Sequence, residues 1–146
     1  MSRAFVKDDD DSPDPAAVRP VGTAPNYVTP RGLESLKKAL SQAEAAQDER
    51  EVRYYRERIE TAILIDPAQH KSDKVEFGAS VVARDNRGRA LQLQIVGEDE
   101  ADPVNGTISF ESPIAQALLG HAAGERVVVQ RPAGPIRYTI ESVSYE

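Results

Sequence analysis

Apolar residues in segment 27–66 recur at helical spacing. Thr29 suits a helix N-cap and Pro30 the first helical position. The apolar stripe that follows contains Leu33, Leu36, Leu40 and Ala43. A second stripe contains Val52, Tyr55, Ile59 and Ile63. Because the second stripe is out of phase with the first, the pattern favours a turn near residues 47–51 and a short antiparallel helical hairpin. One continuous helix is the alternative, since the turn would contain neither Gly nor Pro.

Apolar and polar residues alternate in much of segment 75–146, as in strands with one buried face. The expected strands are 75–84, 89–96, 107–110, 126–130 and 136–142. Between the third and fourth lies a short predicted helix, with Ser112 as N-cap, Pro113 at the first helical position and Gly120 at the end. The chain is therefore predicted to be an α+β protein, with a helical hairpin followed by a small antiparallel sheet and one helix.

Composition divides the chain further. Residues 1–26 contain Asp8, Asp9, Asp10 and Asp11 and several prolines, with little to bury, so this segment is predicted to be a disordered arm without a site. The expected organisation is arm 1–26, hairpin 27–66, linker 67–74 and sheet domain 75–146.

Charge and cysteine content limit the function classes. The 146 residues carry a formal net charge of −6 and contain no Cys. The acidic balance predicts a protein partner rather than broad or sequence-specific DNA binding. The absence of Cys excludes thiolate metal sites and disulfides, and no apolar stretch approaches the roughly 20 residues of a membrane span. We expect a soluble, cytoplasmic protein.

Other motifs carry no predicted chemistry. Asp99, Glu100, Ala101 and Asp102 spell a helicase signature, but the chain has no phosphate-binding P-loop, so this run is interpreted as a surface loop. His70 and His121 are far apart in the sequence, which supports neither a zinc site nor a catalytic triad. No metal, cofactor or independent enzyme activity is expected.

Several motifs of the second half occur in an order that resembles the C-terminal domain of the GreA/GreB transcript-cleavage factors. These are residues 77–79, 95–102, 112–120 and 127–129, followed by Pro132, Gly134, Tyr138, Ile140, Val143 and Tyr145. The resemblance covers roughly residues 75–146 and implies an FKBP-like fold. Prolyl isomerase activity is not expected from this fold, because the sequence offers few aromatic residues for a pocket.

In the first half, residues 27–36 resemble the start of the family's first helix, and residues 63–66 resemble the end of the second. The family's coiled coil is longer, and its acidic tip helps to hold a catalytic Mg²⁺ inside RNA polymerase. Here the only candidate tip carboxylates are Asp48, Glu49 and Glu51, on arms of roughly 27 Å. Solubility alone would also explain an acidic tip, since positively and negatively charged residues alternate around it and could pair on the helix surface. They are Glu49, Arg50, Glu51, Arg53, Arg56, Glu57, Arg58 and Glu60.

The resemblance implies a partner and a docking surface. The family's C-terminal domain binds the rim of the polymerase secondary channel, on the β′ subunit, through a loop that corresponds to Glu111, Ser112, Pro113 and Ile114. We therefore expect an elongation regulator without full cleavage activity, which at most stimulates the polymerase's own RNA cleavage. The alternatives are a true cleavage factor that uses Asp48 and Glu49, and a binding module whose partner is not polymerase.

Overall fold

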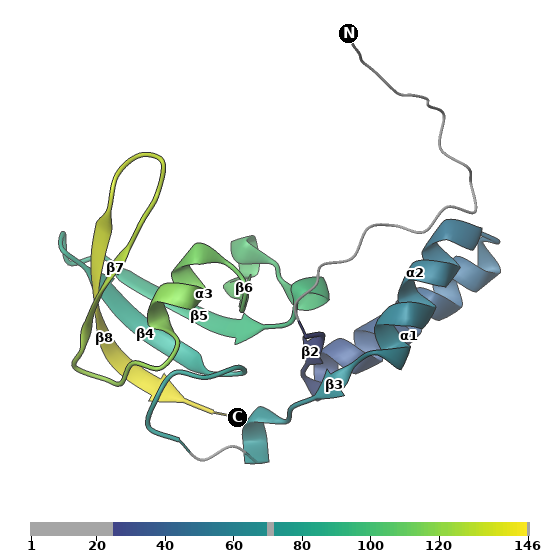
Figure 1. The fold of residues 1–146 in the computed structure, drawn as a ribbon, viewed down its shortest axis with the longest axis horizontal. Helices are drawn as coiled ribbons and strands as arrows, with labels where there is room; N and C mark the ends of the chain where they lie inside the picture. Colours follow the sequence, from purple (N-terminus) through teal and green to yellow (C-terminus); the bar gives the residue numbers. More distant parts are fainter. Residues whose placement is uncertain (1–24, 70–71, 146) are drawn as a thin grey trace, which may run out of the picture.

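The computed structural model describes residues 25–69 and 72–145. Figure 1 shows paired helices at one end of the molecule and a sheet at the other. The elements are β2 (Tyr27–Val28), α1 (Pro30–Ala45), α2 (Glu49–Glu60), β3 (Ile63–Leu64), β4 (Ser80–Asp85), β5 (Ala90–Val96), β6 (Thr107–Ser109), α3 (Pro113–Leu118), β7 (Arg126–Val129) and β8 (Ile136–Ser144). The predicted mixture of helices and sheet is confirmed. The predicted arm lies outside the described residues, apart from residues 25 and 26.

The helices α1 and α2 lie side by side, and the chain reverses between them (Figure 1). Thr29 caps α1 by accepting a hydrogen bond from the Gly32 N–H at 3.1 Å, and Pro30 is the first helical residue. At the base of the pair, β2 and β3 form a parallel two-stranded ladder in which Tyr27 is opposite Ile63. No helix in the described ranges is long and apolar enough to span a membrane.

The predicted apolar stripe of the second helix is not its most buried face, although Val52 in this stripe is half-buried. The buried residues of α2 are Tyr54 and Arg58, whereas Tyr55 and Ile59 are half-buried and Ile63 is 46% exposed. The reason is that α2 contacts a polar loop of the sheet domain as well as α1, so that its most buried face carries polar groups. In α1, Leu36 and Ala43 are buried as the pattern predicts.

Five strands form one sheet in the order β6-β5-β4-β8-β7. Four of them pair antiparallel, but β6 pairs parallel to β5, with Gln94 opposite Thr107, so the prediction of an antiparallel sheet is wrong at this edge. The physical reason is the connection, residues 97–106, which makes two short 3₁₀ turns (Glu98–Glu100 and Pro103–Asn105) instead of a tight hairpin.

The first strand begins later than its sequence predicts, at Ser80 instead of residue 75. Gly78 has a φ of +89° and ends a turn, which keeps the preceding residues out of the ladder. Val75 and Phe77 are buried nonetheless. These two residues lie in a buried loop and not in a strand, and hydrophobicity alone does not distinguish the two.

The core lies between the sheet and α3. Ala115 and Leu118 on α3 are fully buried against alternating residues of the sheet, among them Ile95 and Ile140. Ser112 caps α3 by accepting from the Ala115 N–H at 3.3 Å, as its sequence predicts. This packing fixes the loop that precedes α3.

Candidate functional site

Three surfaces could carry function: the hairpin tip (residues 46–51), the loop before α3 (residues 110–114, the Glu111 loop) and a loop that joins the two halves (residues 97–100, the clamp loop). The tip turns without Gly because Gln47 itself adopts a left-handed conformation, with a φ of 56°. Its N–H donates to the Glu44 carbonyl at 3.1 Å, and the Asp48 N–H donates to the Ala43 carbonyl at 3.0 Å. The turn thus satisfies carbonyls that the end of α1 would otherwise leave unpaired.

The three candidate carboxylates lie together at the start of α2. Asp48 is the N-cap, and its side chain accepts from the Glu51 N–H at 3.2 Å. Glu49 and Glu51 occupy the first turn, where negative charge interacts favourably with the helix dipole. Each carboxylate therefore has a structural reason to be at the tip. Any contribution to a metal site would need further ligands from a partner.

The expected surface pairing of the hairpin holds for only some of its charges. Arg56 lies 3.4 Å from Glu44 on the exposed surface. Arg58, in contrast, is only 5% exposed and points away from solvent. The interpretation of Arg58 as a surface residue is wrong because the sheet domain covers this face of α2.

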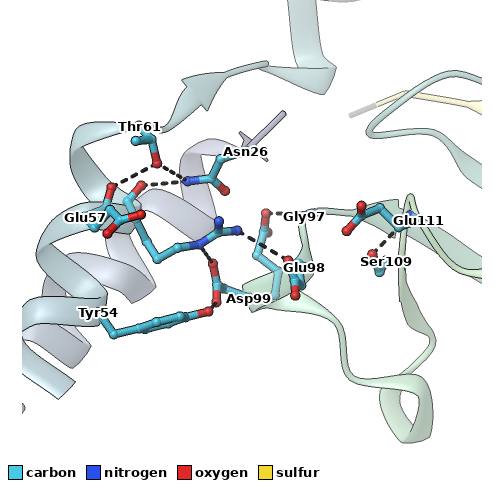
Figure 2. Close-up of polar contacts among 11 residues, drawn as sticks. Asn26, Tyr54, Glu57, Thr61, Gly97, Glu98, Asp99, Ser109 and Glu111 are labelled. Carbon is cyan, nitrogen blue, oxygen red and sulfur yellow. Dashed lines mark hydrogen bonds and ion pairs between the residues drawn. The ribbon is translucent and has the colours of Figure 1, made fainter. Parts of the chain in front are cut away.

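The clamp loop holds Arg58 through Asp99, whose contact with Tyr54 is visible in Figure 2. One Asp99 carboxylate oxygen accepts from Arg58 Nε at 2.6 Å, and the other accepts from the Tyr54 hydroxyl at 2.5 Å. Glu98 lies 3.7 Å from the same guanidinium. Tyr54 and Arg58 are one helical turn apart, so both reach the same carboxylate. The arrangement links α2 to the sheet domain through a largely buried ion pair.

The next residue, Glu100, holds the start of α1. Its carboxylate accepts from the Thr29 N–H at 3.0 Å and from the Thr29 hydroxyl at 2.5 Å. Two glycines make room for the loop: a Cβ on Gly32 would overlap the Glu100 carboxylate, and a Cβ on Gly97 would overlap the Tyr27 carbonyl oxygen. The acidic run at 99–102 is therefore only partly the surface loop that the sequence suggested. Its first two residues join the halves of the protein.

Aromatic rings strengthen the same junction. Tyr27 packs against Phe77 and Phe110, with ring centroids 5.5 and 5.2 Å apart, and the two phenylalanines are 5.7 Å from each other. Phe110 immediately precedes Glu111. The hairpin base and the Glu111 loop thus share one packed cluster, which limits how far one can move relative to the other.

The Glu111 loop is held by short-range hydrogen bonds. The Ser112 hydroxyl donates to the Ser109 carbonyl at 2.7 Å, and the Glu111 N–H donates to the Ser109 hydroxyl at 3.1 Å, as Figure 2 shows for the second contact. The Gln116 side chain donates to the Phe110 carbonyl at 2.7 Å. Glu111 and Pro113 are exposed, while Ile114 is half-buried against the core. Two of the four expected docking residues are therefore presented to solvent on a braced backbone.

The contacts of the clamp loop with α2 were not predictable from local sequence patterns. Tyr54, Arg58 and Asp99 are distant in the chain, and nothing in their local pattern pairs them. The available signals were indirect: a glycine before an acidic run at Gly97, and a second glycine one turn into the first helix at Gly32.

The family model described as "Transcription elongation factor, GreA/GreB, C-term" matches residues 69–145. The chain is 39% identical over 116 residues to the transcription elongation factor GreA of Desulfovibrio desulfuricans, which covers 79% of this chain and 68% of that protein. It is 46% identical over 88 residues to GreA of an Anaeromyxobacter species, covering 60% of this chain and 53% of the relative.

Among solved structures, the prokaryotic transcription elongation factor GreA/GreB from Nitrosomonas europaea superposes with a TM-score of 0.45 at 24% identity. This match covers 82% of this chain and 98% of that one.

Proposed function

This chain belongs to the GreA/GreB family of transcription elongation factors, and from that membership we propose that it regulates elongation by binding RNA polymerase at its secondary channel. The family match contains the whole sheet, α3 and the Glu111 loop. The observation that carries the proposal is the Glu111 loop itself, in which an exposed carboxylate and an exposed proline stand on a hydrogen-bonded turn within the matched segment.

The proposed docking partner is the rim of the channel on the β′ subunit. A rigid loop loses little conformational entropy on binding, because its backbone is already ordered by Ser109 and Ser112. The Glu111 carboxylate would provide charge complementarity to a basic site, and Pro113 would provide a flat apolar contact. Ile114 supports the loop from below through its contact with the core.

The hairpin supports occupation of the channel without delivery of a catalytic metal. The 16 residues of α1 and 12 residues of α2 correspond to roughly 24 and 18 Å. In addition, the Asp48 carboxylate is engaged in capping α2. We propose that the tip occludes the entrance and that the clamp loop fixes its direction relative to the Glu111 loop.

Binding of the purified protein to core RNA polymerase tests this proposal. The wild type should bind with micromolar or tighter affinity, and a full-length GreA should displace it. The Glu111→Lys, Pro113→Ala variant should bind at least tenfold more weakly. Glu60→Lys is a charge-matched control, because Glu60 is exposed at the last position of α2, where a cation suits the helix dipole.

Two outcomes would contradict the proposal. Absence of binding at protein concentrations of tens of micromolar would show that this member of the family does not bind RNA polymerase. Binding that Glu111→Lys, Pro113→Ala and Glu60→Lys weaken equally would show that the Glu111 loop is not the docking surface.

A further inference from the structure

Positive charge gathers at one end of the sheet. Segments 84–89 and 126–141 contain six arginines and only two carboxylates, a formal charge of +4 in a chain whose net charge is −6. We call this region the arginine end, and its arginines are Arg84, Arg87, Arg89, Arg126, Arg131 and Arg137. The net charge predicts a protein partner, but its uneven distribution leaves one surface that is suited to a polyanion.

The strand register places three of these arginines on the solvent face of β4, β8 and β7. Thr139 of β8 is opposite Arg84 on one side and Arg126 on the other, and Arg137 is opposite Val128 in the neighbouring row. Neighbouring strands lie about 4.8 Å apart and β8 lies between β4 and β7, so the backbones of Arg84 and Arg126 are roughly 10 Å from each other. All three arginines are exposed, as is Val128.

The other three arginines continue this surface around the end of the sheet. Arg87, Arg89 and Arg131 line one small groove, together with Asp85, Pro135 and Ile136, between the β4–β5 turn and the β7–β8 turn. The Asp85 carboxylate in this groove accepts from the backbone N–H groups of Arg87 and Arg89 at 2.9 and 2.8 Å. Those bonds hold the pKa of Asp85 below its usual value. Asp85 therefore stabilises the turn through the backbone, while its charge offsets part of the positive charge of Arg87 and Arg89.

Local neutralisation is incomplete. Arg84 pairs with Glu141 at 2.6 Å, and Arg131 donates to the Gly134 carbonyl at 3.1 Å. Arg126 and Arg137 have no ion-pair partner among the residues that the structure describes. A guanidinium binds phosphate oxygens through two parallel N–H groups, and a row of guanidinium groups can displace the counterions of a nucleic acid.

We propose that the arginine end binds the sugar–phosphate backbone of duplex DNA without reading its sequence. A duplex presents a rigid array of phosphates, so little conformational entropy of the DNA is lost when it binds to an open sheet face. An acidic peptide would need an enclosing groove or apolar anchors to offset its ordering, and Val128 is the only exposed large apolar side chain among the described residues of β4, β7 and β8. The exposed rows also lack the aromatic platforms typical of single-strand binding.

The location makes this interaction compatible with the proposed function but independent of it. In Figure 1 the β4–β5 and β7–β8 turns lie at the end of the molecule opposite the α1–α2 pair. The Glu111 loop, through which docking is proposed, contains none of the residues of the arginine end, so binding through that loop does not use these arginines. The inference goes beyond polymerase docking, and it can be tested with the protein alone.

Fluorescence anisotropy with a short labelled DNA duplex, at roughly 50 and 200 mM salt, provides the test. The wild type should bind in the range of about 10⁻⁶ to 10⁻⁴ M, with an affinity that falls steeply with salt. Arg126→Gln with Arg137→Gln should weaken binding roughly tenfold and reduce the salt slope by about 1.8, if each arginine neutralises one phosphate. Lys37→Gln with Lys38→Gln is the control, since both lysines are exposed on α1 and the charge change is equal.

A gain-of-binding variant makes the test independent of folding defects. Glu141→Gln removes a carboxylate and releases Arg84, so it should strengthen DNA binding several-fold. The inference would be overturned by absence of wild-type binding at about 100 μM, by equal losses in the two double variants, or by competition from polyglutamate as effective as that from DNA. Tighter binding to single-stranded RNA than to the duplex would also overturn it, because the surface would then recognise a different nucleic acid.

Discussion

Replacing Asp99 by Ala should destabilise the protein more than any other change of a single carboxylate in the clamp loop. Arg58 is only 5% exposed, and it would lose the partner that lies 2.6 Å away. Tyr54 would lose the same acceptor. What remains near the guanidinium is Glu98 at 3.7 Å, on a side chain that is 46% exposed.

The structure allows an estimate of this cost. Removing one partner of a buried ion pair typically costs about 3–5 kcal/mol, because the other charge stays buried. The Asp99 side chain retains 13% exposure, and Glu98 can move closer, so we expect the lower limit, about 3 kcal/mol. For a chain of this size, that loss lowers the melting temperature by roughly 6–12 °C.

Urea denaturation and calorimetry would measure the effect. Glu98→Ala is the matched control and should cost less than about 1 kcal/mol, since the Glu98 side chain is 46% exposed and lies 3.7 Å from the guanidinium. A double variant, Arg58→Met with Asp99→Leu, should recover most of the lost stability, because it removes both buried charges. If Asp99→Ala were no more destabilising than Glu98→Ala, the clamp would not hold the hairpin in solution.

Two further predictions concern the glycines and the tip. Gly97→Ala should lower the free energy of unfolding by about 1–3 kcal/mol, and by more than Gly32→Ala does. The reason is that a Cβ on residue 97 would overlap the Tyr27 backbone, whereas a Cβ on residue 32 would overlap only the movable Glu100 side chain. The urea midpoints of the two variants test this order, and the reverse order would refute it. Asp48→Ala should lower the free energy of unfolding by about 0.5–2 kcal/mol, because α2 loses its N-cap, whereas Asp48→Asn keeps a capping oxygen and should be nearly neutral. Thermal melting measures both effects. Equal melting temperatures for the two variants would mean that the cap contributes nothing to stability.

Local chemistry was sufficient to predict much of the fold. Thr29 with Pro30 and Ser112 with Pro113 marked two helix starts, because capping depends only on neighbours in the chain. The α1 stripe was recognisable for the same reason, as its buried residues Leu36 and Ala43 follow helical spacing.

Errors arose where distant residues decide the structure. The parallel pairing of β6 depends on how residues 97–106 fold back, and apolar alternation does not encode strand direction. The buried face of α2 depends on Asp99, 41 residues after Arg58. Helical periodicity alone assigns a charged residue such as Arg58 to the solvent face, because its buried partner is distant in the sequence.

The candidate site was predictable to different degrees. The Glu111 loop could be identified from its order relative to neighbouring motifs, and the structure adds the hydrogen bonds that brace it. The tip carboxylates could be named, but their capping role required the geometry of the turn at Gln47.

A transcript-cleavage assay on backtracked elongation complexes tests the central claim most directly. Added alone, the protein should produce little cleavage, and added to reactions that contain limiting GreA it should inhibit GreA-stimulated cleavage in proportion to its concentration. Glu111→Lys with Pro113→Ala should abolish this inhibition. Strong cleavage by the protein alone that Asp48→Asn with Glu49→Gln removes would contradict the account and identify the tip as a functional metal-binding element.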